Sequence, residues 1–392
     1  MAIHKEPVLR IAYFSPLPPA RSGIADYSSE LLPYLANYAN ITLFTADPHE
    51  ISPALTQQFS TQPIRKYPEQ RWQYDITLYQ MGNSAYHKEM YEMFRRFPGI
   101  VVLHDYGLHQ FIAYLAAANH KTADYSREVA YELGSQGIAY IRQAQAHTLH
   151  NAPLNRRLLD LSLGVIVHSD YVRNLILARG EKTAVTVIPH QMTTFTGKSR
   201  HHQLPFPENA VIFASVGQVT SAKQIEFALR AFKKVRQTNP HAYYFIVGEE
   251  TKDMNLSNII HTLDLSDYVH HIGYVADKET FTDWIYTADV IINLRYPTIG
   301  ETSSTALRAL AAGRPLILFD HGWYSELPDS TCIKTAPLDE DALIEAMATL
   351  ASQPELRQRL GKSGQQHITA HHHPTHVADA YLTFIGQRLS IF

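Results

Sequence analysis

The chain has 392 residues, of which 45% are hydrophobic and 18% charged, a balance that excludes a disordered or fibrous protein. Its formal net charge of −3 is spread evenly, and without a basic excess a nucleic-acid partner is disfavoured. The single cysteine, Cys332, excludes a disulfide within the chain and fits a reducing compartment. No apolar run predicts a membrane span, and residues 1–7 lack the apolar core of a signal peptide, so we expect a soluble, cytoplasmic protein.

Short apolar runs rich in β-branched residues alternate with segments of helical length along the whole chain. In the first half, strands are predicted at residues 9–14, 41–45, 75–80, 100–104, 165–168 and 185–189. In the second half, they are predicted at residues 211–216, 243–247, 269–272, 290–294, 315–319 and 331–333. Helices are predicted between them, for example at 24–37 and 171–178. Continuous apolar strands joined by helical crossovers indicate an α/β protein with parallel sheets covered on both faces.

About a dozen strands are too many for one sheet of ordinary width. The polar segment 193–208, rich in His, Thr and Pro, supplies a natural break. We therefore predict two Rossmann-like domains, residues 1–195 and 196–375, with a C-terminal helix at 376–392 that packs back on the first domain. Open parallel sheets bind ligands beyond the carboxyl ends of their strands, so the residues that follow strands are the candidates for a site.

The segment from Leu294 to Pro315 predicts strand, turn, helix and then a Gly-Arg-Pro break before the next strand. Thr302, Ser303 or Ser304 can cap this helix, and Gly313 is placed to end it. The free N–H groups and the positive end of such a helix suit a phosphate, whereas Glu301 at the same tip suits a sugar hydroxyl. A plain capped helix that binds nothing explains the pattern equally well.

A second segment, Ala214 to Lys223, predicts a strand, a glycine turn at Gly217 and a helix capped by Ser221. Lys223 would then lie in the first helical turn, where a cation conflicts with the positive end of the helix. A bound anion would relieve the conflict. A solvated surface lysine is the alternative.

Two further segments follow strands in the first half of the chain. Residues 15–27 form a proline-rich loop in which Gly23 permits close approach of a ligand to the backbone. A later strand ends in His104 and Asp105, and His104 is placed to donate to a hydroxyl or to carry a proton, although a lone histidine is more often structural. The histidine run 371–373 predicts a solvated turn rather than a metal site.

In this order, the motifs Pro-Pro-x-x-Ser-Gly-Ile-Ala-Asp-Tyr, His-Asp, Gly-x(5)-Lys and Gly-Glu-Thr-Ser…Gly-Arg-Pro resemble those of the retaining glycosyltransferases of family 4. The resemblance runs from Arg10 to about Glu326 and implies the GT-B fold, with two Rossmann-like domains facing each other across a cleft. It also implies transfer of a sugar from a nucleotide sugar to an acceptor hydroxyl, with retention and without a metal or other cofactor, in polysaccharide or glycoconjugate biosynthesis. The acceptor would be a carbohydrate or a lipid-linked molecule, selected by the first domain through the distinctive loops 47–73 and 107–154. Weak peripheral contact with the inner membrane face is compatible with this function.

Residue by residue, the resemblance matches Lys223 to a lysine that binds the diphosphate and Gly23 to a glycine that approaches the donor phosphates. It places His104 near the donor sugar and Glu301 beside a glutamate that contacts the sugar. The expected catalytic residues are His104, Asp105 and Glu301. The expected donor-binding residues are Gly23, Gly217, Gln218, Lys223, Arg295, Gly300, Thr302, Ser303, Ser304 and Arg308.

The sequence departs from the family pattern at three positions. Gln218 stands where the family has an arginine, and Gly300 and Arg308 stand where it has two glutamates. An arginine cannot accept hydrogen bonds from ribose hydroxyls. We expect Arg295 to replace the positive charge that is lost at Gln218.

Three other functions compete with glycosyl transfer. A GT-B scaffold that binds a partner or ligand without transferring sugar would explain the departures. A nucleotide-sugar epimerase of the same fold would need a set of acidic residues that the sequence does not show. A nicotinamide dehydrogenase is the weakest alternative, because no Gly-x-Gly-x-x-Gly follows a predicted strand.

Overall fold

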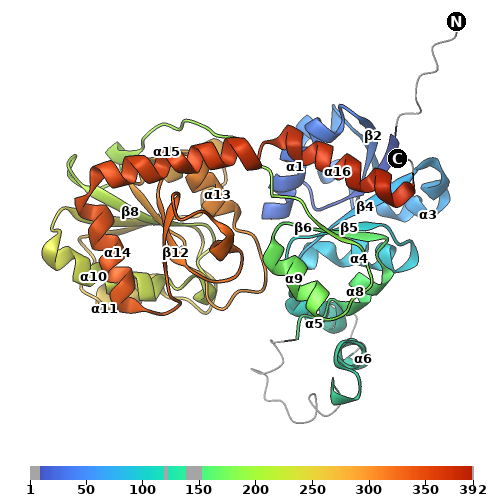
Figure 1. Ribbon diagram of the computed structural model, residues 1–392, viewed down its shortest axis with the longest axis horizontal. Coiled ribbons are helices and arrows are strands. Elements are labelled where there is room, and N and C mark those ends of the chain that lie inside the picture. Colours follow the sequence, from blue (N-terminus) through green and yellow to red (C-terminus); the bar gives the residue numbers. More distant parts are fainter. Residues whose placement is uncertain (1–8, 119–121, 138–151, 391–392) are drawn as a thin grey trace, which may run out of the picture. The chain divides into compact units, whose positions relative to one another are not determined.

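A computed structural model of the protein describes residues 9–118, 122–137 and 152–390, and these residues form two compact units (Figure 1). The first unit contains the described residues up to Gln191, together with Ile299–Thr302 and the C-terminal segment from Pro374. The second contains Met192–Thr298 and Ser303–His373. None of the helices in the described part of the chain is long and apolar enough to cross a membrane.

The first unit is built on a parallel seven-stranded sheet with the order β3-β2-β1-β4-β5-β6-β7. The strands are β1 (Leu9–Phe14), β2 (Ala39–Thr45), β3 (Ser60–Pro63), β4 (Ile76–Met81), β5 (Ile100–Leu103), β6 (Gly164–Val167) and β7 (Val185–Val187). Six of them were predicted, and β3 was not. The polar sequence of β3 ends in proline, and this is tolerated because β3 is an edge strand.

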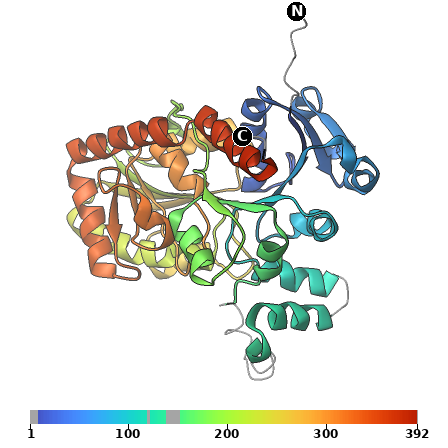
Figure 2. The same ribbon diagram turned by 45° about the vertical axis from the view of Figure 1, so that its right-hand side comes forward.

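Helices cover both faces of this sheet (Figure 2). The longer ones are α1 (Gly23–Leu35), α4 (Lys88–Arg96), α5 (His109–Ala118), α6 (Thr122–Leu133), α8 (Arg156–Leu161), α9 (Asp170–Ala178) and α16 (Pro374–Leu389), and the short ones are α2 (Pro53–Thr56) and α3 (Tyr67–Gln70). Apolar side chains of α4, α5, α6, α8 and α9 form the core on one face, and those of α1 and α16 form the core on the other. The hydroxyls of Tyr27 in α1 and Tyr381 in α16 are hydrogen-bonded at 2.6 Å, so the C-terminal helix is fixed to the first unit.

The second unit is built on a parallel six-stranded sheet with the order β10-β9-β8-β11-β12-β13. Its strands are β8 (Val211–Val216), β9 (Ala242–Val247), β10 (Val269–Gly273), β11 (Val290–Ile292), β12 (Leu316–Phe319) and β13 (Cys332–Thr335). Its helices are α10 (Ile225–Thr238), α11 (Leu256–Thr262), α12 (Lys278–Thr287), α13 (Ser304–Ala311), α14 (Glu340–Ser352) and α15 (Pro354–His371). Side chains of α10, α11 and α14 fill the core on one face, and those of α12 and α13 fill the core on the other.

Each sheet has one point where the order of strands reverses. In the first sheet the chain runs outward from β1 to β3 and then returns to place β4 on the other side of β1. In the second sheet β11 returns in the same way to the other side of β8. Ligands of open α/β sheets bind at the carboxyl ends of the strands beside such a point, so each unit offers one position for a ligand.

Three local predictions were wrong. Ser221 does not cap a helix: Ser221–Lys223 is a separate 3₁₀ turn, and α10 begins only at Ile225 because Gln224 adopts a left-handed conformation (φ 54°). Neither stretch predicted as a long loop is one: 47–73 contains α2, β3 and α3, and 107–154 contains α5 and α6, although residues 119–121 and 138–151 lie outside the described residues. In the histidine run, His372 is buried (6% exposed) at the end of α15 and is not in a solvated turn.

Candidate functional site

Gly217 follows β8 at the reversal point of the second sheet. Its φ of +98° is a conformation that favours glycine, and its N–H donates to the carbonyl of Val247 at 2.8 Å. A Cβ atom at this position would lie 2.5 Å from Nζ of Lys223. The backbone angle therefore favours glycine at position 217, and a Cβ there would displace the ammonium group of Lys223.

Lys223 folds back onto this turn, and its Nζ donates to the carbonyl of Val216 at 2.9 Å. It forms no ion pair with a carboxylate among the residues that the structure describes. Burial of the ammonium and the nearby positive charge of Arg295 lower the pKa of Lys223 to about 7. A cation held near another cation without a carboxylate is an arrangement that a bound anion would stabilise.

The loops that follow β8 and β11 are tied to each other. The N–H of Tyr296 donates to the carbonyl of Ala222 at 2.8 Å, and the side-chain amide of Gln224 donates to the carbonyl of Tyr296 at 2.9 Å. These bonds hold the turn that carries Lys223 beside the loop that carries Arg295.

The N-terminus of α13 lies at the same place. Ser303 is its N-cap: the hydroxyl accepts from the N–H of Ala306 at 3.2 Å and donates to Asn293 at 3.2 Å. Thr305, in the first turn, has its hydroxyl 3.4 Å from the position that a Cβ on Gly217 would take. The turn at Gly217 thus lies beside the Lys223 ammonium, the Arg295 guanidinium and the positive end of α13. This combination is suited to a diphosphate.

The other donor-binding residues predicted in the second unit lie around this position. Gln218 is exposed next to Gly217, and Ser304 is the first residue of α13. Arg308 lies one turn further along α13 and is buried, with 8% of its surface exposed.

Gly300, Glu301 and Thr302 pack with the first unit. The carbonyl of Ile299 accepts from the N–H of Gly107 at 2.8 Å, and Gly300 (φ +80°) is so close to Tyr106 that a Cβ would lie 2.5 Å from the Cβ of that tyrosine. The carboxylate of Glu301 accepts from the N–H of Ile299 at 2.8 Å. Glu301 therefore stabilises the turn that carries it.

His104 belongs to a buried histidine network in the first unit. Nδ1 of His168 lies 2.8 Å from the carbonyl of Ile188 and must donate to it, and Nε2 of His168 lies 3.2 Å from Nδ1 of His104. Nε2 of His104 lies 2.7 Å from Oε1 of Gln80, and because an amide oxygen can only accept, Nε2 is the donor in this bond. Burial, together with His168 and His190, holds the pKa of His104 well below its usual range. His104 is thus a neutral imidazole with both nitrogens engaged.

The remaining two candidates flank the loops of the first sheet. The carboxylate of Asp105 accepts from the N–H of Asn83 at 2.7 Å and so holds the loop that follows β4. Gly23 is the first residue of α1, and no described atom lies within 4 Å of the position that its Cβ would take. Its backbone is therefore accessible.

The sequence analysis missed two residues of the second-unit site. Gly248 (φ +141°) must be a glycine, because a Cβ would lie 2.2 Å from the carbonyl oxygen of Gly217. The sequence contains a signal for it, since Val-Gly ends both β8 and β9. Thr305 was missed because its closeness to Gly217 depends on the tertiary arrangement.

Two parallel-sheet α/β domains of this kind are the architecture of the GT-B glycosyltransferase fold, and solved structures agree. Sucrose-phosphate synthase from Thermosynechococcus elongatus superposes with a TM-score of 0.69 at 18% identity and covers 98% of this chain and 100% of its own. HepE of Anabaena, solved in complex with UDP-glucose, gives a TM-score of 0.67 at 14% identity and covers 98% of this chain and 100% of its own. The protein has the GT-B fold.

The family match lies in the second unit. Residues 198–367 match the family described as Glycosyl transferases group 1. Glycogen synthases from two strains of Mycobacterium tuberculosis are each 26% identical over 158 residues, which is 40% of this chain. The match spans 37% of the length of these relatives.

Proposed function

We propose that this protein transfers a glycosyl group from a nucleoside-diphosphate sugar to an acceptor hydroxyl. The observation that carries the proposal is the Lys223 ammonium, held against Gly217 beside Arg295 and the first turn of α13 without a carboxylate partner among the described residues. The family match covers these residues. Structures of HepE with UDP and with UDP-glucose support a uridine nucleotide as the donor.

In the proposed reaction, the bond between the anomeric carbon and the β-phosphate oxygen breaks, and its electron pair leaves with the nucleoside diphosphate. Lys223, Arg295 and the amides at the start of α13 stabilise this negative charge. The acceptor oxygen bonds to the anomeric carbon on the same face, and its proton passes to the departing phosphate oxygen. Retention follows from the family resemblance, and a double displacement would instead require a carboxylate against the anomeric carbon.

We also propose that the reaction requires no metal ion, because two side-chain cations and a helix terminus already supply the positive charge. Arg295 takes the place of the arginine that Gln218 replaces. His104 acts as a neutral orienting group near the sugar, and Asp105 and Glu301 hold the loops around it. The similarity to glycogen and sucrose-phosphate synthases supports a carbohydrate acceptor in polysaccharide or glycoconjugate biosynthesis.

A cytoplasmic location and weak contact with a membrane or a lipid-linked acceptor stay proposals. The first unit contains two pairs of consecutive arginines, at 95–96 and 156–157. Arg95 and Arg96 are exposed at the end of α4, whereas Arg157 is paired with Glu128 at 2.9 Å. The exposed pair alone is a small charge for binding anionic lipid.

Calorimetric titration with UDP-, GDP-, ADP- and dTDP-glucose, followed by a nucleotide-release assay in EDTA, tests this proposal. We expect one nucleotide sugar to bind and release its nucleoside diphosphate, and Lys223→Met to abolish the binding. Proton NMR of the product then reports the anomeric configuration. Binding without release, in the presence of any saccharide, would favour the scaffold, and a change of configuration within the free nucleotide sugar would favour the epimerase.

A further inference from the structure

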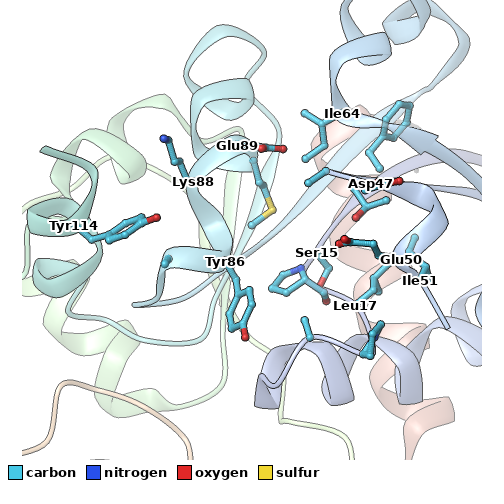
Figure 3. A pocket seen from close by; sticks show the side chains of 18 residues that line it. Ser15, Leu17, Asp47, Glu50, Ile51, Ile64, Tyr86, Lys88, Glu89 and Tyr114 are labelled. Carbon is cyan, nitrogen blue, oxygen red and sulfur yellow. The ribbon is translucent and has the colours of Figure 1, made fainter. Parts of the chain in front are cut away.

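A cavity of about 450 Å³ opens in the first unit at the carboxyl ends of β1, β2 and β4 (Figure 3). Its walls are the loop that follows β1, the loop that follows β2 and the start of α4. This is the reversal point of the first sheet, the position at which open α/β sheets bind ligands. The volume falls within the range of small-molecule pockets.

Carboxylates dominate the charge of the cavity lining, where Asp47, Glu50 and Glu89 stand against a single ammonium, that of Lys88. Asp47 accepts a hydrogen bond from the N–H of His49 at 2.9 Å and keeps its second oxygen for other donors. In the part of the chain that the structure describes, Glu50 and Glu89 form neither an ion pair nor a side-chain hydrogen bond. Carboxylate oxygens without intramolecular donors are suited to accept from ligand hydroxyls.

Two tyrosines complete the lining. Tyr86 and Tyr114 are 52% and 42% exposed, and both border the cavity. Figure 3 shows them on the other side of the view from Asp47 and Glu50. Aromatic faces next to hydrogen-bond acceptors match a sugar ring, which presents C–H groups on its faces and hydroxyls at its edge.

We propose that this cavity binds one or two glycosyl units of the acceptor, and that the acceptor is uncharged or carries an amine rather than a phosphate or a carboxylate. This inference rests on the proposed glycosyl transfer. The carboxylates accept hydrogen bonds from hydroxyl or ammonium groups, and the tyrosines contact the ring faces. The excess negative charge repels uronates and sugar phosphates, so the cavity selects the acceptor by charge.

An array of neutral, amine-bearing and uronate oligosaccharides, probed with the full-length protein, tests this charge selection. We expect the tightest ligand to be neutral or amine-bearing and to bind at least 10-fold more tightly than the uronate oligosaccharides. Tight binding of a uronate oligosaccharide would overturn the proposal, as would the absence of binding to every class.

Variants then locate the binding. E50Q/E89Q keeps the shape of both side chains but removes their charge. We expect this variant to bind the preferred oligosaccharide about 10-fold more weakly and to discriminate less against uronate oligosaccharides. E69Q, at an exposed carboxylate in α3 outside the cavity, is the matched control and should leave the affinity and the discrimination unchanged. Y86A should weaken binding, whereas Y38A, at a tyrosine of similar exposure (48%) elsewhere, should not. Unchanged binding in both E50Q/E89Q and Y86A would refute the assignment to this cavity.

Binding of UDP-glucose by the wild-type protein is measured in parallel. Absence of nucleotide-sugar binding would remove the proposed function itself. If the nucleotide sugar binds and the oligosaccharides do not, only the inference about the cavity fails.

Discussion

The affinity for a nucleotide sugar should depend strongly on pH, because the proposed diphosphate site contains a lysine with a pKa of about 7. At pH 7 half of the Lys223 side chains are charged, whereas at pH 9 about one in a hundred is. If the diphosphate binds only the ammonium form, the dissociation constant for UDP-glucose rises about 50-fold between pH 7 and pH 9, about 2.3 kcal/mol. Binding below pH 7 should be nearly independent of pH.

Isothermal titration calorimetry with UDP-glucose in a series of buffers measures this profile. UDP-glucose is preferred to UDP, because a terminal phosphate itself titrates near about pH 6. The matched variant is Lys223→Arg, whose guanidinium stays charged over the whole range and should flatten the profile. A wild-type profile as flat as that of Lys223→Arg would refute the assignment of Lys223 to the diphosphate.

The remaining predictions concern stability, packing and the affinity for UDP-glucose. Lys223→Met should raise the melting temperature of the unliganded protein, because folding at pH 7 must discharge or bury the Lys223 ammonium. The lowered pKa of Lys223 bounds the gain in unfolding free energy at about 4 kcal/mol at pH 7, and calorimetric melting from pH 6 to 10 should show the gain shrinking as pH rises. Gly217→Ala should weaken the binding of UDP-glucose at least 10-fold in the calorimetric titrations, because the added Cβ displaces the Lys223 ammonium. Gly361→Ala should lower the free energy of unfolding in urea by about 2–4 kcal/mol, because its Cβ would lie 2.0 Å from the carbonyl oxygen of Gly313. Tyr27→Phe should cost about 1 kcal/mol in the same unfolding assay by removing the bond to Tyr381, and an unchanged midpoint would argue against a tightly docked α16. Burial lowers the pKa of His87 to about 3 and that of His168 to about 4. The free energy of unfolding should therefore be full above pH 6.5 and fall by up to about 1.4 kcal/mol per pH unit for each histidine as pH drops toward these values. His87→Leu should make the melting temperature less sensitive to acid.

Sequence pattern alone predicted the elements whose side chains are apolar and buried. Strands β1 and β8 have the predicted bounds, because buried parallel strands are continuous apolar runs between turn residues. The edge strand β3 has no such run and is recognisable only through its pairing with β2. The start of α10 was misplaced because a left-handed Gln224 leaves no mark in the sequence.

The site residues that follow a strand directly in the sequence could be predicted. Gly217 and Lys223 were found in this way, and the structure places the ammonium of one against the backbone of the other. Thr305 comes from a helix almost 90 positions later in the chain, so only tertiary packing reveals it. Asp47, Glu50 and Tyr114 line the acidic cavity of the first unit and belong to stretches 47–73 and 107–154, which were expected to contact the acceptor. No periodic pattern in the sequence shows that these side chains share a cavity.

The central claim is that the diphosphate of a nucleotide sugar binds at the reversal point of the second sheet. A crystal structure of the protein with UDP tests it most directly. The account predicts a phosphate oxygen at about 2.7–3.0 Å from Nζ of Lys223, with the first turn of α13 facing the same phosphates. A nucleotide whose phosphates lie away from Lys223, or in the acidic cavity of the first unit, would contradict it.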